Sequence, residues 1–380
     1  MSHKEGRLKL VLDEGGDGWR VRTAVLVGRD KEIAREARVE AATLASVAGF
    51  IGAYASGDRE AVRPHASETF HKNALSVAEF ADSPLDAESI LAGEYELRAG
   101  EETTELTVAL DEATHQFTVV AQGEIGRGRC VDEVTTYTAG ETRRLSAALL
   151  TRPTVELFAK CYAAGDASRL KHLTTRIWGP RVWSACTTDR EDVLLGLPLP
   201  PLDFAPADPA HAPSVRFNGP SVEVRQVTDD AVVSYRLNAA GGRVLVDDVE
   251  VIDLRGVLKL RDRLAVGVAM DQAADAILTG EVETLRDAST DAMNRLVWDW
   301  STPEDLPASL DLVPHLKGRV LDVSEAEGQY AVTVGGDRPT ARLTLSGERP
   351  RIDEVVFLNA TGVEATRLTH AARVYRAGGF

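Results

Sequence analysis

The feature that most constrains this chain is a segment that occurs three times. Around Gly57, Gly165 and Gly280, three stretches align without a gap: VAGFIGAYASGDREAVRPHASETFHKNAL, VELFAKCYAAGDASRLKHLTTRIWGPRVW and MDQAADAILTGEVETLRDASTDAMNRLVW. The glycines lie 108 and 115 residues apart, so the repeating unit has the size of a small domain and is too long for a helical solenoid repeat. We therefore expect three similar domains in tandem.

Each copy predicts a helical hairpin. Apolar residues stand seven and three positions before each glycine, on one helix face: Phe50 and Tyr54, Phe158 and Tyr162, Ala273 and Ile277. The glycine then ends the helix in a left-handed conformation. An acidic residue follows it at once and is expected to cap the second helix by accepting backbone N–H groups.

A β-rich stretch follows every hairpin. Polar and apolar residues alternate there, and turn pairs such as Gly241-Gly242 and Gly335-Gly336 interrupt them, which is typical of an antiparallel meander. An acidic pair recurs late in each stretch, led by Asp132, Asp247 and Asp353. These carboxylates are candidate general bases with a pKa raised in an apolar cavity. A β-bulge or a solvent-facing row is the stronger interpretation, because every copy carries the pair.

Helices ending in AYASGD or CYAAGD, a second helix ending in Ser or Thr, and a long antiparallel sheet resemble the nuclear transport factor 2-like superfamily, which includes ketosteroid-isomerase-like and SnoaL-like proteins. The third copy departs from the pattern at Ala273 and Glu281. The resemblance covers about 350 residues and implies an α+β fold of three tandem cone-shaped domains, each a helical hairpin packed on a strongly curved antiparallel sheet. We place them at residues 31–150, 151–267 and 268–380. Residues 1–30 resemble the last strand pair of a further repeat.

Composition restricts the partners. Lys and Arg number 43 against 59 Asp and Glu, a net charge of −16, which argues against nucleic acid and anionic membranes. No run of 18 apolar residues predicts membrane insertion, and no signal peptide is visible, so a cytoplasmic location is the default. A secreted or periplasmic location applies if the chain is a fragment. No nucleotide or metal motif occurs, so no cofactor and no metal are expected.

Aromatic side chains are the candidate ligand-binding residues, because they could line the mouth of a cone: Trp178, Trp183, Trp298, Trp300, Tyr54 and Tyr162. Core packing is the alternative for each of them. His65 is a further catalytic candidate. Its positions in the sister copies hold Leu173 and Ala288, which favours a half-buried packing site.

The function expected from these patterns is that of a non-enzymatic binding or scaffold protein, holding a small apolar ligand or a protein partner. The superfamily fold serves many activities, and its catalytic residues do not map onto this chain. Its domains would pair through sheet faces, within the chain or in a homodimer. The alternative is an isomerase- or dehydratase-type enzyme with one active cone and two degenerate ones. That alternative predicts that one domain alone has an open apolar cavity with an inward-facing ionisable side chain.

Overall fold

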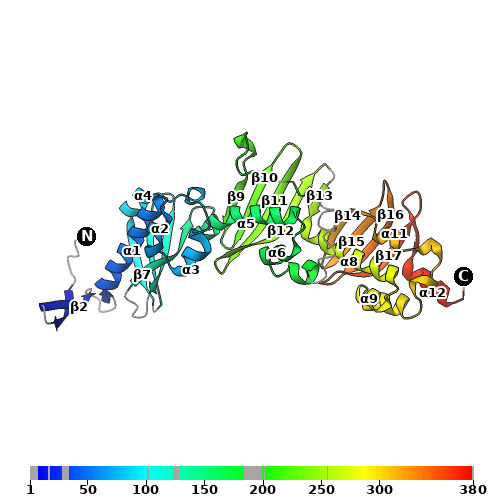
Figure 1. Ribbon diagram of the computed structural model, residues 1–380, viewed down its shortest axis with the longest axis horizontal. Coiled ribbons are helices and arrows are strands. Elements are labelled where there is room, and N and C mark those ends of the chain that lie inside the picture. Colours follow the sequence, from blue (N-terminus) through cyan, green and yellow to red (C-terminus); the bar gives the residue numbers. More distant parts are fainter. Residues whose placement is uncertain are drawn as a thin grey trace. The chain divides into compact units, whose positions relative to one another are not determined.

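The computed structural model describes residues 7–15, 18–27, 34–100, 102–122, 128–183, 199–200, 202–254 and 256–378 (Figure 1). They belong to two compact units. The first comprises Met1–Pro153, Arg216–Val222 and Ala239–Val244. The second comprises Thr154–Val215, Glu223–Asn238 and Leu245–Phe380.

Helices open each repeat. A long helix comes first in every case: α1 (Ala37–Ala55), α5 (Leu145–Ala163) and α8 (Leu260–Thr279). Shorter helices follow: α2 (Arg59–Val62), α3 (Glu68–Phe70) and α4 (Ala87–Ala92), then α6 (Ala167–Leu173), then α9 (Val282–Asp287), α10 (Asp291–Met293) and α11 (Val313–Leu316). Helix α12 (Leu368–Arg376) follows the last strand. The expected borders at 150/151 and 267/268 fall inside α5 and α8.

Among the described residues, five strands follow the helices in each repeat. The first repeat has β4 (Glu94–Ala99), β5 (Thr103–Ala109), β6 (Thr114–Gln122), β7 (Gly128–Tyr137) and β8 (Thr142–Arg144). The second has β9 (Ser214–Asn218), β10 (Ser221–Val227), β11 (Ala231–Ala240), β12 (Arg243–Asp253) and β13 (Gly256–Lys259). The third has β14 (Arg319–Ala326), β15 (Gln329–Gly335), β16 (Pro339–Ser346), β17 (Arg351–Leu358) and β18 (Glu364–Arg367). Before α1, a three-stranded sheet holds β1 (Arg7–Gly15), β2 (Gly18–Val27) and β3 (Ala34–Glu36).

The expectation of three cone-shaped domains is wrong. Strands β4 to β13 form one ten-stranded sheet, β14 to β18 form a separate five-stranded sheet, and neither sheet curls strongly or closes. The ten strands are joined where Thr142 of β8 pairs in parallel with Asn218 of β9. Gly219 donates its N–H to the Thr142 carbonyl at 3.1 Å, and Phe217 donates to the Glu141 carboxylate at 3.0 Å. An edge strand leaves N–H and C=O groups unpaired, so satisfying them with the next strand favours a continuous sheet over separate cones.

The helix ends agree with the sequence. Gly57, Gly165 and Gly280 have φ of 75°, 68° and 71°, so the predicted left-handed helix ends are confirmed. Asp58 and Asp166 accept backbone N–H groups of the second helix as caps, whereas Glu281 accepts only the Thr284 hydroxyl.

A turn of π-helix recurs in register fourteen residues after each glycine, at His71–Leu75, Gly179–Trp183 and Asn294–Trp298. Each turn ends on a large buried side chain, Leu75, Trp183 or Trp298. Leu75 and Trp298 share a hydrophobic core with the long helix and the sheet of their repeats, and Trp183 stacks on Trp178. Across the part of the chain described here, no helix combines the length and apolarity needed to cross a bilayer.

Candidate functional site

The leading acidic residue of each recurrent pair has the same partner in every repeat. Asp132 accepts the Ser67 hydroxyl, Asp247 accepts the Thr175 hydroxyl at 2.8 Å, and Asp353 accepts the Thr290 hydroxyl at 2.7 Å. The backbone N–H of each hydroxyl residue also donates, at 2.8 to 2.9 Å, to the carbonyl just before the acid. Each of these carboxylates therefore holds its strand to the helical segment that precedes the sheet in the sequence.

A β-bulge explains how two consecutive acids come to have separate roles. In the first repeat, Thr118 pairs with Glu133 and Val119 with Val131, so Asp132 is the extra residue. In the third, Thr344 pairs with Glu354 and Leu345 with Ile352, so Asp353 is extra. The predicted bulge is confirmed in these two repeats. A bulge interrupts the regular alternation of side chains, so the two neighbouring acids can contact different partners.

The second acid of each pair holds the start of the helix that follows the sheet. Glu133 accepts the backbone N–H of Ser146 at 3.1 Å and also its hydroxyl. Glu354 does the same with Thr369. Asp248 accepts the N–H of Arg261 at 3.2 Å, and the Arg261 guanidinium lies 3.6 Å from it. Each acid thereby satisfies a helix N-terminal N–H group.

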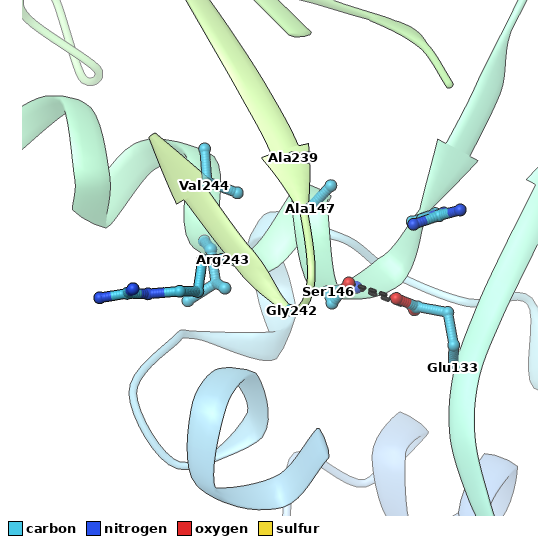
Figure 2. A pocket seen from close by; sticks show the side chains of 9 residues that line it. Glu133, Ser146, Ala147, Ala239, Gly242, Arg243 and Val244 are labelled. Carbon is cyan, nitrogen blue, oxygen red and sulfur yellow. Dashed lines mark hydrogen bonds between the residues drawn. The ribbon is translucent and has the colours of Figure 1, made fainter. Parts of the chain in front are cut away.

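Burial shifts the pKa of two of these second acids, Glu133 and Asp248. It raises the pKa of Glu133 above its ordinary value, against the hydrogen bonds from Ser146. It also raises the pKa of Asp248, against the nearby charge of Arg261. Figure 2 shows the Ser146 to Glu133 hydrogen bond beside the β11–β12 turn, with Arg243 pointing away from Glu133. The cavity there measures about 20 Å³, which is room for about one water molecule and too little for a substrate.

The candidate aromatic residues lie mostly in the core. Five are buried, namely Tyr54, Tyr162, Trp178, Trp183 and Trp298, whereas Trp300 is 55 % exposed beneath the Arg376 guanidinium. The buried indoles have internal acceptors: Trp178 donates to the Asp247 carbonyl, Trp183 to the Thr174 hydroxyl and Trp298 to the Ser289 hydroxyl. Tyr54 donates to the Ser83 carbonyl at 2.8 Å. The geometry of these five is that of core residues.

His65 is half-buried and packs against α1. A Cβ placed on Gly49 would lie 2.3 Å from Cε1 of His65, so the imidazole rests on the backbone of that glycine. This contact agrees with the packing interpretation.

A polar row in the first repeat is a candidate site that the sequence patterns did not reveal. We call it the His115 row: His115 on β6 pairs with Thr136 on β7, and Thr136 pairs with Arg143 on β8. Directly opposed residues of an antiparallel sheet point to the same face. That face is the buried one, because His115 is 6 % and Thr136 8 % exposed. Nδ1 of His115 lies 3.1 Å from the Thr136 hydroxyl.

Electrostatics link the His115 row to neighbouring groups. Burial lowers the pKa of His115, the charge of Arg143 lowers it further, and Asp86 opposes both. Burial raises the pKa of the Tyr54 hydroxyl, and Arg143 opposes this shift. At neutral pH the row therefore holds a neutral imidazole and a guanidinium. One signal could have revealed it: in the string HQFTV, period-two alternation places His115 on the same face as Phe117 and Val119.

No group of three or more His, Cys, Asp or Glu side chains within the described residues is arranged to hold a metal ion. Comparisons with protein-family models, curated proteins and solved structures found no match to this chain. The resemblance to the nuclear transport factor 2-like superfamily stays a prediction.

Proposed function

We propose that this chain is a non-enzymatic binding or scaffold protein built of tandem repeats. One observation carries the proposal: Asp132, Asp247 and Asp353 all accept the hydroxyl of the segment in front of them. A catalytic base is needed only in the repeat that holds the active site, whereas a contact that stabilises the fold is expected in every repeat. A cytoplasmic location and pairing through sheet faces, both expected from the sequence, belong to this proposal.

Three matched substitutions test it. We expect Asp132→Asn, Asp247→Asn and Asp353→Asn each to lower the free energy of unfolding by about 1 kcal/mol or more, since each weakens a charge-assisted hydrogen bond. Urea unfolding of the full chain measures the change. Asp208→Asn is the control, because that exposed carboxylate caps only a short turn.

The proposal fails if one of the three aspartate variants loses turnover of a ketone or dienol substrate while its stability is unchanged. That result would instead support the second candidate function, an isomerase- or dehydratase-type enzyme with one active repeat. The specific observation favouring this second candidate is the His115 row, which places an ionisable side chain on the inner face of the first repeat. An enzyme of this kind would lose turnover on His115→Gln.

A further inference from the structure

One edge of the ten-stranded sheet is open and apolar. Strand β13 ends the sheet on the side opposite β4. Val257 of β13 lies directly opposite Ile252 of β12, so both point to the same face, and they are 56 % and 41 % exposed. Leu254, in the turn between the two strands, is fully exposed. This edge therefore offers backbone groups and an apolar surface to a further strand.

The other open edges of the two larger sheets carry features that hinder pairing, within the residues that the structure describes. Strand β4 has exposed charged side chains at three of its six positions. Strand β14 has an irregular register beside Val320, whose carbonyl accepts the Arg263 guanidinium. Strand β18 also pairs with an irregular register. Charges and bulges keep edge strands from pairing, whereas β13 pairs regularly with β12 and has no charge at residues 256–258.

The first repeat shows what covers an edge of this kind. Strand β8 holds the same place as β13, because each is the last strand of its repeat and directly precedes the next long helix. Strand β8 does not end the sheet, since Thr142 pairs with Asn218 of the second repeat. Within one chain, this edge therefore already extends the sheet onto another copy of the repeat. A repeat from a second molecule continues that arrangement at β13.

Strand β13 is suited to pairing with its own copy. A two-fold axis through Val257, perpendicular to the sheet, would set two antiparallel β13 strands side by side and the two Val257 side chains opposite each other. Ile252 flanks Val257 in each molecule, so an apolar row of four side chains would cross the contact without a charge. Pairing with β4 of a second molecule would instead set charged side chains against this row.

We propose that two copies of the chain pair antiparallel through their β13 edges and join two ten-stranded sheets into one. Backbone hydrogen bonds connect the two strands, and the shared row of Ile252 and Val257 leaves water. Each strand contributes only four residues, so the interface is small and the association is weak and concentration-dependent. This inference rests on the proposed function, of which it names the partner, and it locates the contact at a sheet edge instead of a sheet face.

Sedimentation of the full chain from about 10 µM to about 1 mM tests the inference. We expect the average mass to rise from that of one chain toward that of two. Val257→Lys places a charge at the centre of the apolar row and should weaken the association at least about tenfold. Val227→Lys is the matched control, because Val227 is 50 % exposed on β10, an interior strand of the same sheet. It should associate like the wild type.

Three results would overturn the inference: a wild-type chain that stays monomeric over this range, equal association of Val257→Lys and the wild type, or growth beyond two chains, which indicates a head-to-tail contact. If Val257→Lys does not fold, Ile252→Lys alters the same row and should give a similar loss of association. Unfolding of the aspartate variants is measured on dilute, monomeric chain, so failure of the proposed function and failure of this inference are read separately.

Discussion

Burial governs how single residues such as His115 titrate. Burial and Arg143 lower its pKa below the ordinary value of 6.5. The unfolded chain therefore takes up a proton at this residue before the folded chain does, and stability falls as the pH drops below about 6.5. We expect the wild-type Tm to fall more between about pH 7 and pH 5 than the Tm of His115→Gln. Parallel falls in the two proteins would contradict the assigned environment.

How far single residues could be predicted depends on whether their partners are local. Gly57 and Asp58 act within a few residues of themselves, so the sequence sufficed for both. Asp132 was expected on a bulge or in a solvent-facing row and lies on a bulge, but its hydroxyl partner is 65 residues away. The His115 row requires the register of three strands, which local alternation leaves open.

Glycines at element ends and glycines inside helices should respond in opposite ways to alanine. Gly57 has φ 75° and Gly52 lies within α1, and a Cβ on either would meet nothing within 4 Å. We expect Gly57→Ala to cost roughly 1–2 kcal/mol through left-handed strain alone. Gly52→Ala should stabilise the chain by about 0.5–1 kcal/mol, because glycine weakens a helix interior. Thermal unfolding of both variants checks this, and a stabilising Gly57→Ala would refute it.

Elements were predicted better than the pairing between them. The alternation of side chains located the strands, and helical spacing located the hairpins. Nothing local predicts that β8 and β9 pair in parallel, because that contact joins Thr142 to Asn218 across most of a repeat. The recurrent π-helical turns also left no signature in residue spacing.

At the scale of the whole molecule, the second and third repeats meet through buried charges. Arg181 lies 3.7 Å from Asp262 at the start of α8, and Arg261 lies 3.8 Å from the same carboxylate. Asp262 is 4 % exposed. Removing one partner of a buried pair leaves the other charge unbalanced in a medium of low dielectric. Breaking this contact should therefore lower the free energy of unfolding more than breaking a surface ion pair of similar geometry.

We expect Asp262→Ala to lower the free energy of unfolding by about 3–5 kcal/mol. Glu283→Ala, which removes an exposed partner 3.0 Å from Arg286, should change it by less than about 1 kcal/mol. Urea unfolding of the full chain compares the two variants. Equal effects would mean that water reaches Asp262.

The contacts of Glu133, Asp248 and Glu354 limit where repeats of this kind can be joined or exchanged. Each of these carboxylates holds a sheet to the first turn of the helix that follows it, which is α5, α8 or the shorter α12. A gene crossover at either expected border, inside α5 or α8, would therefore cut a helix and separate it from its anchoring acid. An exchange point just after a helical hairpin would break a different contact, the hydrogen bond from Ser67, Thr175 or Thr290 to the aspartate of the sheet that follows. A transferable segment therefore has to keep each hairpin together with its own sheet.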